Sequence, residues 1–128
     1  MKPGDRLPDL ERLIDLGALV AYAAATWDWY APHYDPAAAT ANRLPAPLAD
    51  GQMFGALLAE QALDWAPAMS QVRKMGFRFK AMVFAGESVL CHGTVEEVDG
   101  RRVRVSQSVT CGGRVVLDSA YTELELPE

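Results

Sequence analysis

The segment Gln52–Trp65, QMFGALLAEQALDW, decides the fold. It predicts an α-helix whose surface is mostly apolar, through Phe54, Leu57, Leu58, Ala62 and Leu63. Its polar strip is narrow and consists of Glu60, Gln61 and Asp64. A helix with so little polar surface must be wrapped by other elements, and three small residues would let a sheet approach its backbone closely: Gly55, Ala56 and Ala59. We therefore expect a curved sheet folded around this helix.

The residues after the helix have strand spacing and are divided by glycine-containing turns. The predicted strands are Lys74–Val83, Val89–Val98, Arg101–Cys111 and Arg114–Leu126, and Arg6–Ile14 could add an edge strand. A three-residue loop ending at Gly100 would pair Val95 with Val103. Because helices come first and strands follow, the pattern predicts an α+β fold with an antiparallel sheet.

Composition limits the possible functions. A chain of 128 residues, 50% of them hydrophobic, is long enough for one domain over residues 1–128. The net charge of -5 argues against a nucleic-acid partner, and no apolar run is long enough to cross a membrane. The polar N-terminus predicts a soluble cytoplasmic protein. Cys91 and Cys111 are too few for a disulfide scaffold, so we expect reduced packing residues.

Chemistry is expected in Trp27–Asp35, WDWYAPHYD, which follows a predicted helix that starts at Asp15. Asp28 and His33 are five residues apart, and a loop of that length can turn both side chains toward one site. Such a pair could hold a water molecule and pass its proton, as the addition of water to an activated double bond requires. The spacing equally allows a structural interpretation, in which Asp28 caps a turn and His33 hydrogen-bonds a buried carbonyl.

From about Asp15 to Leu126 the chain resembles the MaoC-like dehydratases, the (R)-specific enoyl-CoA hydratase group of the hotdog fold. The hydratase motif of that family reads Ser-Gly-Asp-any-Asn-Pro-any-His-any-Asp, and TWDWYAPHYD, which begins at Thr26, aligns with it without a gap. Asp28, His33 and Asp35 match the motif. The resemblance implies a curved antiparallel sheet wrapped around a long central helix.

The departures from the motif are also informative. Trp27 and Tyr30 stand where the family has Gly and Asn, and the proline is displaced to Pro32. The Trp-Asp form resembles members that handle large acyl groups, including the steroid side-chain dehydratases. The family's His-Gly pair, at the start of the long helix, reads Asp50-Gly51 here.

The resemblance implies a reaction as well as a fold. Water held between Asp28 and His33 would add to the β-carbon of a trans-2-enoyl thioester, and dehydration of an (R)-3-hydroxyacyl thioester would be the reverse. The Gly51 amide would donate to the enolate oxygen from the N-terminus of the long helix. A carboxylate at Asp50 would oppose the developing negative charge if it faces the site. Neither a cofactor nor a metal ion is expected.

Candidate substrate-binding residues are aromatic or basic. An acyl tunnel could be lined by Trp27, Trp29, Tyr30 and Tyr34, although aromatic residues are first of all core residues. Arg78 and Lys80 could contact the phosphates of coenzyme A, although basic residues of a strand are more often a solvated face.

Two other functions stay open. Hotdog thioesterases often direct water with a carboxylate on the central helix, and Glu60 is the one available here, although its place on the polar strip favours solvent. The chain could also be a non-catalytic hotdog subunit. In every case we expect the sheet edge to pair with a second copy or a related hotdog chain. The expected ligand is a thioester of coenzyme A or of acyl carrier protein.

Overall fold

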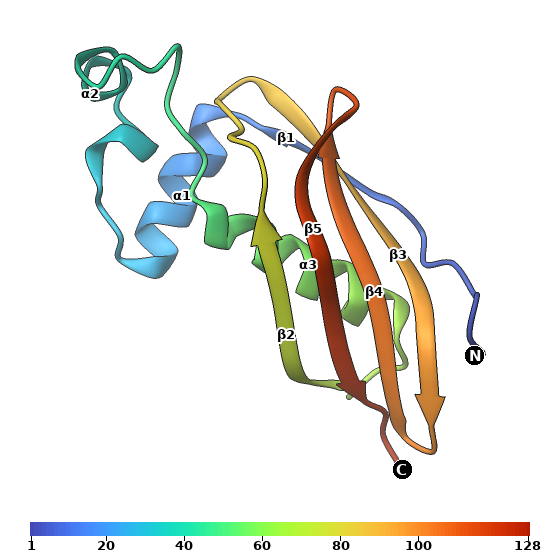
Figure 1. Ribbon diagram of the computed structural model, residues 1–128. Coiled ribbons are helices and arrows are strands. Elements are labelled where there is room, and N and C mark those ends of the chain that lie inside the picture. Colours follow the sequence, from blue (N-terminus) through green and yellow to red (C-terminus); the bar gives the residue numbers. More distant parts are fainter.

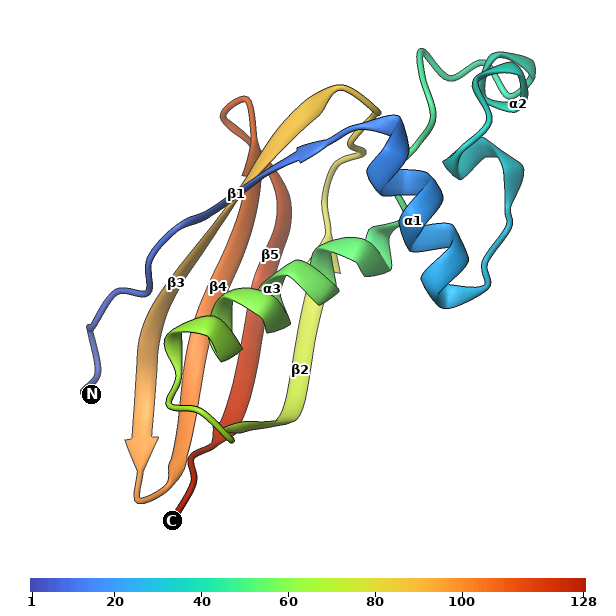
Figure 2. The same cartoon turned by 180° about the vertical axis from the view of Figure 1, so that it is seen from behind.

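The computed structural model describes residues 1–128. The elements are β1 (Leu10–Ile14), α1 (Leu16–Thr26), the 3-10 turn η1 (Ala31–His33), α2 (Pro36–Ala41), α3 (Gly51–Trp65), β2 (Gln71–Phe79), β3 (Glu87–Asp99), β4 (Arg102–Cys111) and β5 (Arg114–Glu125). All five strands form one antiparallel sheet in the order β1-β3-β4-β5-β2. The sheet curves around α3, which lies along its concave face (Figure 1 and Figure 2). The predicted α+β architecture is confirmed.

The wrapping of α3 follows from its sequence. Met53, Phe54, Leu57 and Leu58 are buried in the largest apolar cluster of the protein. Gly55 lies so close to β2 that a Cβ atom built on it would be 2.6 Å from the Phe77 ring. Small residues therefore let the sheet approach the helix, as the sequence predicted. Leu63, which was expected among the apolar residues, is 40% exposed.

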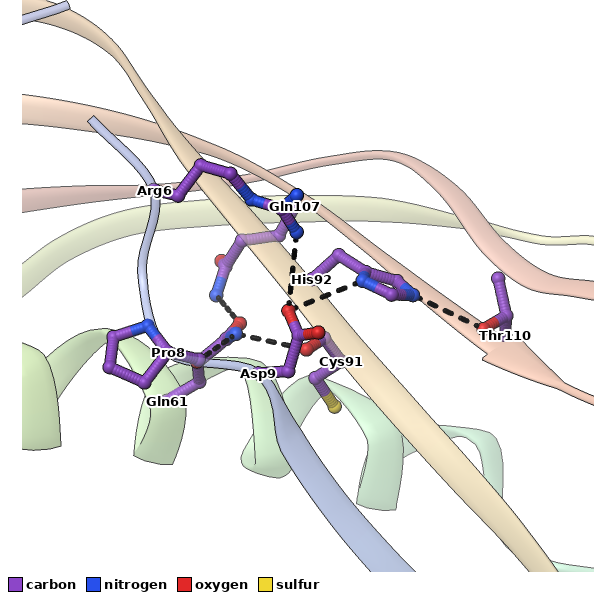
Figure 3. Close-up of polar contacts among 8 residues, drawn as sticks. All are labelled: Arg6, Pro8, Asp9, Gln61, Cys91, His92, Gln107 and Thr110. Carbon is purple, nitrogen blue, oxygen red and sulfur yellow. Dashed lines mark hydrogen bonds and ion pairs between the residues drawn. The ribbon is translucent and has the colours of Figure 1, made fainter. Parts of the chain in front are cut away.

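The predicted polar strip of α3 is wrong at Gln61, which is buried. Its amide nitrogen donates to the carbonyl oxygens of Pro8 and Cys91 at 2.9 Å and 3.0 Å. Gln107 on β4 donates to the Gln61 side-chain oxygen at 3.0 Å and accepts from the Thr122 hydroxyl at 2.6 Å (Figure 3 shows the part of this network that joins the two glutamines). Because every member has a partner, the network is tolerated inside the core.

The predicted register of β3 and β4 is also wrong. Val95 lies opposite Val105, whereas Val103 lies opposite Val98. The turn contains two residues where a three-residue loop was expected, which moves the partner residues by three, and a bulge between Val95 and Glu97 moves them back by one. Gly100 provides the left-handed conformation that this turn needs, with a φ of 57°. The predicted edge strand before α1 is present as β1.

The short helices gather at one end of the molecule. α1, η1 and α2 lie beyond the N-terminal end of α3, while both chain termini lie toward the opposite end (Figure 2). Cys91 and Cys111 are buried and free, as expected. No helix has the length and apolar character that crossing a membrane would require.

Candidate active site

The end of α1 turns the chain back toward the core. Trp27 takes the left-handed conformation with a φ of 56°, in the position where the resembled motif has glycine. The amide of the next residue, Asp28, then donates to the Ala23 carbonyl at 3.0 Å. This reversal brings Asp28 back beside the last turns of α1. Its carboxylate accepts no hydrogen bond from the chain.

A 3-10 turn positions His33. Pro32 is buried, and its carbonyl accepts from the Leu48 amide at 2.9 Å. The Leu48 carbonyl lies 2.7 Å from His33 Nδ1, so Nδ1 carries the proton and donates. The other ring nitrogen, Nε2, has no partner in the chain. One ring nitrogen of His33 therefore hydrogen-bonds a carbonyl, as the structural interpretation expected. The second nitrogen is available for chemistry.

A third segment brings Asp50 to the same place. The Asp50 carboxylate caps α3 by accepting from the Gln52 amide at 3.0 Å. Polar side-chain atoms of Asp28, His33 and Asp50 all lie within 4.8 Å of one another. The structure thus unites the predicted pair and adds the carboxylate that the sequence placed before Gly51. Imidazole and carboxylate are metal-ligand types, so these three side chains could also reach one metal ion.

Next to this cluster is a pocket of about 510 Å³, in the size range of small-molecule sites. His33, Asp50 and Gly51 line one side. The remaining lining comes from the start of α3 and the chain after β2, and is mainly apolar: Leu48, Ala49, Phe54, Phe79, Lys80, Ala81, Met82 and Val83. The pocket therefore combines a mainly apolar wall with a few polar groups.

Gly51 is the first residue of α3, so its amide has no acceptor within the helix, and no loop carbonyl accepts from it. The Phe79 ring packs directly against this glycine, since a Cβ atom at position 51 would overlap the ring. The free amide and the positive end of the helix dipole meet at the pocket, where a negative oxygen would be stabilised.

Sequence reasoning missed Tyr22. This half-buried residue of α1 lines a small hollow together with Asp28, His33 and Asp50. Burial raises the pKa of the Tyr22 hydroxyl, and the charges of Asp50 and Asp28 raise it further. Tyr22 therefore stays a neutral hydrogen-bond donor at physiological pH. Its position in the last turns of α1 is visible in the sequence, but its approach to the cluster depends on the reversal at Trp27.

Three of the four expected tunnel aromatics form a cluster of their own, and the fourth, Tyr30, contacts His33 instead. Trp27 contacts Trp29, and Trp29 contacts Tyr34, with ring centroids 5.8 Å and 5.7 Å apart. Tyr30 packs edge-on against the His33 ring at 5.3 Å. Trp27 is 79% exposed, and the pocket lining includes none of the four. They stand beside the site, with Tyr30 in contact with its histidine.

The other candidates are spread more widely. Lys80 lines the pocket and lies 3.7 Å from Asp118, whereas Arg78 is exposed on β2 and does not line it. Glu60 forms an ion pair with Arg12 and is not in the lining. His92 lies on the outer face of β3, between Asp9 and Thr110 (Figure 3).

A larger groove of about 710 Å³ exists elsewhere and has a different chemistry. It is lined mainly by charges of both signs from β2 to β5: Arg73, Lys74, Glu96, Glu97, Asp99, Arg102, Arg104 and Glu123. Arg104 contacts Glu96 and Glu123 at 3.0 Å and 2.7 Å, so much of this charge is paired within the chain. The groove contains neither a histidine nor a helix N-terminus, and we do not assign chemistry to it.

The family described as the MaoC like domain matches residues 5–117. The chain belongs to the MaoC-like domain family. No curated protein sequence matches this MaoC-like chain.

Solved structures show the same fold. The ChsH1-ChsH2 complex from Mycobacterium tuberculosis contains a chain with a TM-score of 0.90 and 23% identity, covering 98% of each chain. The (R)-hydratase from A. caviae involved in PHA biosynthesis has a TM-score of 0.91 and 21% identity, covering 99% of this chain and 98% of the other. A point mutant of the fluoroacetyl-CoA-specific thioesterase FlK has a TM-score of 0.70 and 14% identity, covering 98% of this chain and 87% of the other. The MaoC-like chain therefore has the expected hotdog fold, which hydratases and a thioesterase share.

Proposed function

We propose that this chain is a hydro-lyase that adds water to a trans-2-enoyl thioester or removes it from an (R)-3-hydroxyacyl thioester. The observation that carries the proposal is the meeting of Asp28 and His33 beside a pocket that also holds the free Gly51 amide. An acid–base pair and an oxyanion donor are the two requirements of this reaction.

The geometry gives each group a role. Because His33 Nδ1 donates to Leu48, Nε2 presents a lone pair. A water molecule between Nε2 and the Asp28 carboxylate would donate one proton to each. One of these bases takes a proton from the water as its oxygen bonds to the β-carbon, and the electrons of the double bond move to the thioester oxygen. The Gly51 amide stabilises that oxygen. Return of a proton to the α-carbon restores the enzyme and completes the addition.

The substrate class follows from the pocket. Its apolar wall suits the acyl chain, and Lys80 at its edge would contact the anionic carrier, either coenzyme A or acyl carrier protein. We keep Arg78 as a candidate for the same contact from the neighbouring strand surface. The contacting rings of Trp27, Trp29 and Tyr34, together with Tyr30 on the His33 ring, would cover a bulky acyl group that extends beyond the pocket.

A hotdog partner chain belongs to the same proposal. β2 is an edge strand, and its unpaired backbone groups would continue the sheet into a second hotdog chain. The matched ChsH1-ChsH2 structure is itself a complex. A cytoplasmic location, which suits two free buried cysteines, is also part of the proposal.

Thioesterase activity is the competing function, because FlK shares the fold. The carboxylate on α3, Glu60, is engaged by Arg12 away from the pocket, which favours hydration over thioester hydrolysis.

One assay separates the activities. Enoyl-CoA substrates from short-chain to steroid-sized are followed by absorbance of the conjugated thioester, with free thiol monitored in parallel. Loss of conjugation without thiol release is the expected result. Thiol release at the same rate would identify a thioesterase, and inactivity toward the whole panel until another hotdog chain is added would identify a non-catalytic subunit.

A further inference from the structure

The two edges of the sheet are not equivalent. β1 has only five residues, and Pro8 lies just before it, so this edge offers few backbone groups for pairing. β2 has nine residues without a proline, and it forms the opposite edge (Figure 1). β2 is therefore the edge on which a partner strand can add.

The β2 edge is strongly basic. Within ten residues it carries Arg73, Lys74, Arg78 and Lys80, all exposed, and no acidic residue. Arg73 contacts Glu125 at 2.7 Å, and Lys80 contacts Asp118 at 3.7 Å. Lys74 and Arg78 form no ion pair within the chain. This edge is thus positive although the whole chain has a net charge of -5.

The neighbouring strand does not neutralise these two charges. Lys74 lies opposite Glu123, but the Glu123 carboxylate is held by Arg104 at 2.7 Å. Arg78 lies opposite Asp118, whose carboxylate is the one near Lys80. The two β5 carboxylates directly opposite Lys74 and Arg78 are therefore engaged by other residues.

A second copy would repeat this charge against itself. In a two-fold antiparallel pairing centred on Gly76, Lys74 of each copy faces Arg78 of the other. Moving the centre one residue toward the C-terminus sets Lys74 of each copy against Lys80 of the other. Each pair occurs twice because the interface is symmetric. Like charges directly opposite each other destabilise strand pairing.

From this charge pattern we propose that the β2 edge docks an unlike hotdog-type chain, whose facing edge strand carries carboxylates opposite Lys74 and Arg78, in preference to a second copy. The inference rests on the strand pairing included in the proposed function and names its partner class. Opposite charges favour the unlike pair, and like charges disfavour the symmetric one.

The same edge leads into the candidate site. Phe79 at the end of β2 and Met82 beyond it are 50% and 57% exposed, and both line the pocket. A partner strand along β2 would cover these side chains and close the pocket on that side. The acidic partner would therefore complete the substrate site as well as the sheet.

A charge-reversed copy of the chain can serve as the acidic partner. Lys74→Glu/Arg78→Glu is mixed with the wild type, and association is measured by sedimentation velocity at low and high ionic strength. We expect the mixed dimer to form roughly tenfold or more tightly than either chain alone, because two attractive pairs replace two repulsive ones. Salt should weaken the mixed dimer and strengthen self-association of the wild type.

Lys2→Glu/Arg43→Glu is the matched control, since both residues are exposed outside the sheet and the change in net charge is identical. The wild type could instead form a tight dimer that salt does not affect and that Lys74→Glu/Arg78→Glu weakens. That result would support strand pairing at β2 but overturn the preference for an unlike partner. A mixture that associates no better than the control mixture would remove β2 as the interface. Neither result depends on hydration of enoyl thioesters, so the proposed reaction is judged separately.

Discussion

The protein contains two aspartate–histidine pairs, and only one of them lies in a site. Asp9 Oδ1 is 3.3 Å from His92 Nδ1, and His92 Nε2 is 3.4 Å from the Thr110 hydroxyl (Figure 3). Both ring nitrogens are thus engaged on the outer face of the sheet. His33 is tethered by one nitrogen only, and one of its ring nitrogens lies within 4.8 Å of an Asp28 carboxylate oxygen next to a pocket.

The difference lies in the backbone around each pair. His92 sits in the middle of β3, where strand neighbours determine its surroundings. His33 ends a 3-10 turn beside the N-terminus of a buried helix, where the Gly51 amide is free. A residue pair becomes a candidate site when an unsatisfied base, an anion-binding backbone and an apolar wall occur together.

Matched substitution of both aspartate–histidine pairs should have the largest effect. His33→Ala or Asp28→Asn should lower hydration by roughly a hundredfold to ten-thousandfold, because general acid–base catalysis is lost. His92→Ala and Asp9→Asn should stay within about twofold of the wild type. Initial rates of enoyl thioester hydration provide the measurement. An intact rate in both site variants would show that the site is misplaced.

A second test concerns the buried network around Gln107, in which every polar group has a hydrogen-bond partner. Gln107→Ala should lower the free energy of unfolding by about 3 kcal/mol, since it leaves a cavity and removes partners from buried polar groups. Urea denaturation measures the loss. Ser106→Ala, on the exposed side of β4, is the control and should change stability little. Equal stability of the two variants would mean that the buried network contributes nothing.

Gly51→Ala probes the close approach of Phe79. The added methyl group must displace the ring, which is half exposed and can move, so we expect about a tenfold loss of kcat/KM with little loss of stability. The double variant Gly51→Ala/Phe79→Ala should recover activity if the loss is steric. Failure to recover would assign the loss to the helix N-terminus itself.

Asp50→Asn tests the carboxylate next to the Gly51 amide. Asparagine keeps the cap of α3, and the removal of a negative charge should raise the hydration rate a few-fold, by roughly 1 kcal/mol or less. The rate and the melting temperature are measured together. A large drop in rate at unchanged stability would instead make Asp50 part of the proton transfer.

The smallest expected effect concerns Glu87, which does not line the candidate site. Its hydrogen bonds from Arg114 and from the Phe84 amide lower its pKa below the ordinary 4.5. The stability that this contributes is present above pH 4.5 and is lost as the pH falls through the lower, folded-state pKa. Glu87→Gln should remove that acid dependence, at less than about 1 kcal/mol because the ion pair is solvent-exposed. The free energy of unfolding is measured against pH for the wild type and for Glu87→Gln. Parallel curves would contradict the assigned role of Glu87.

Local signals made part of this structure predictable. The apolar pattern specifies α3, and Asp15 and Asp50 are residues that begin helices by capping them. The five-residue separation of Asp28 and His33 allowed them to meet, through one reversal and one turn, but it allowed the structural interpretation equally. Such features depend on interactions within a few residues of the chain.

What the sequence did not predict depends on distant contacts. The bulge after Val95 shifts the β3–β4 register, and no local pattern marks it. Gln61 is buried because two carbonyls from other segments receive its amide. The pocket lining likewise combines residues near His33, which precede α3 in the sequence, with Phe79 and Met82, which follow it.

The segment between α1 and α3 joins the sheet side of the molecule through few backbone contacts: Ala49 amide to Val83 carbonyl, Ala85 amide to Pro47 carbonyl, and the bridge between Leu48 and Phe84. Its aromatic surface contributes little to the buried core. Under the proposed function, substitutions there would alter which acyl groups are accepted while the wrapped helix folds as before. The scaffold is therefore well suited to evolve new substrate preferences without first losing stability.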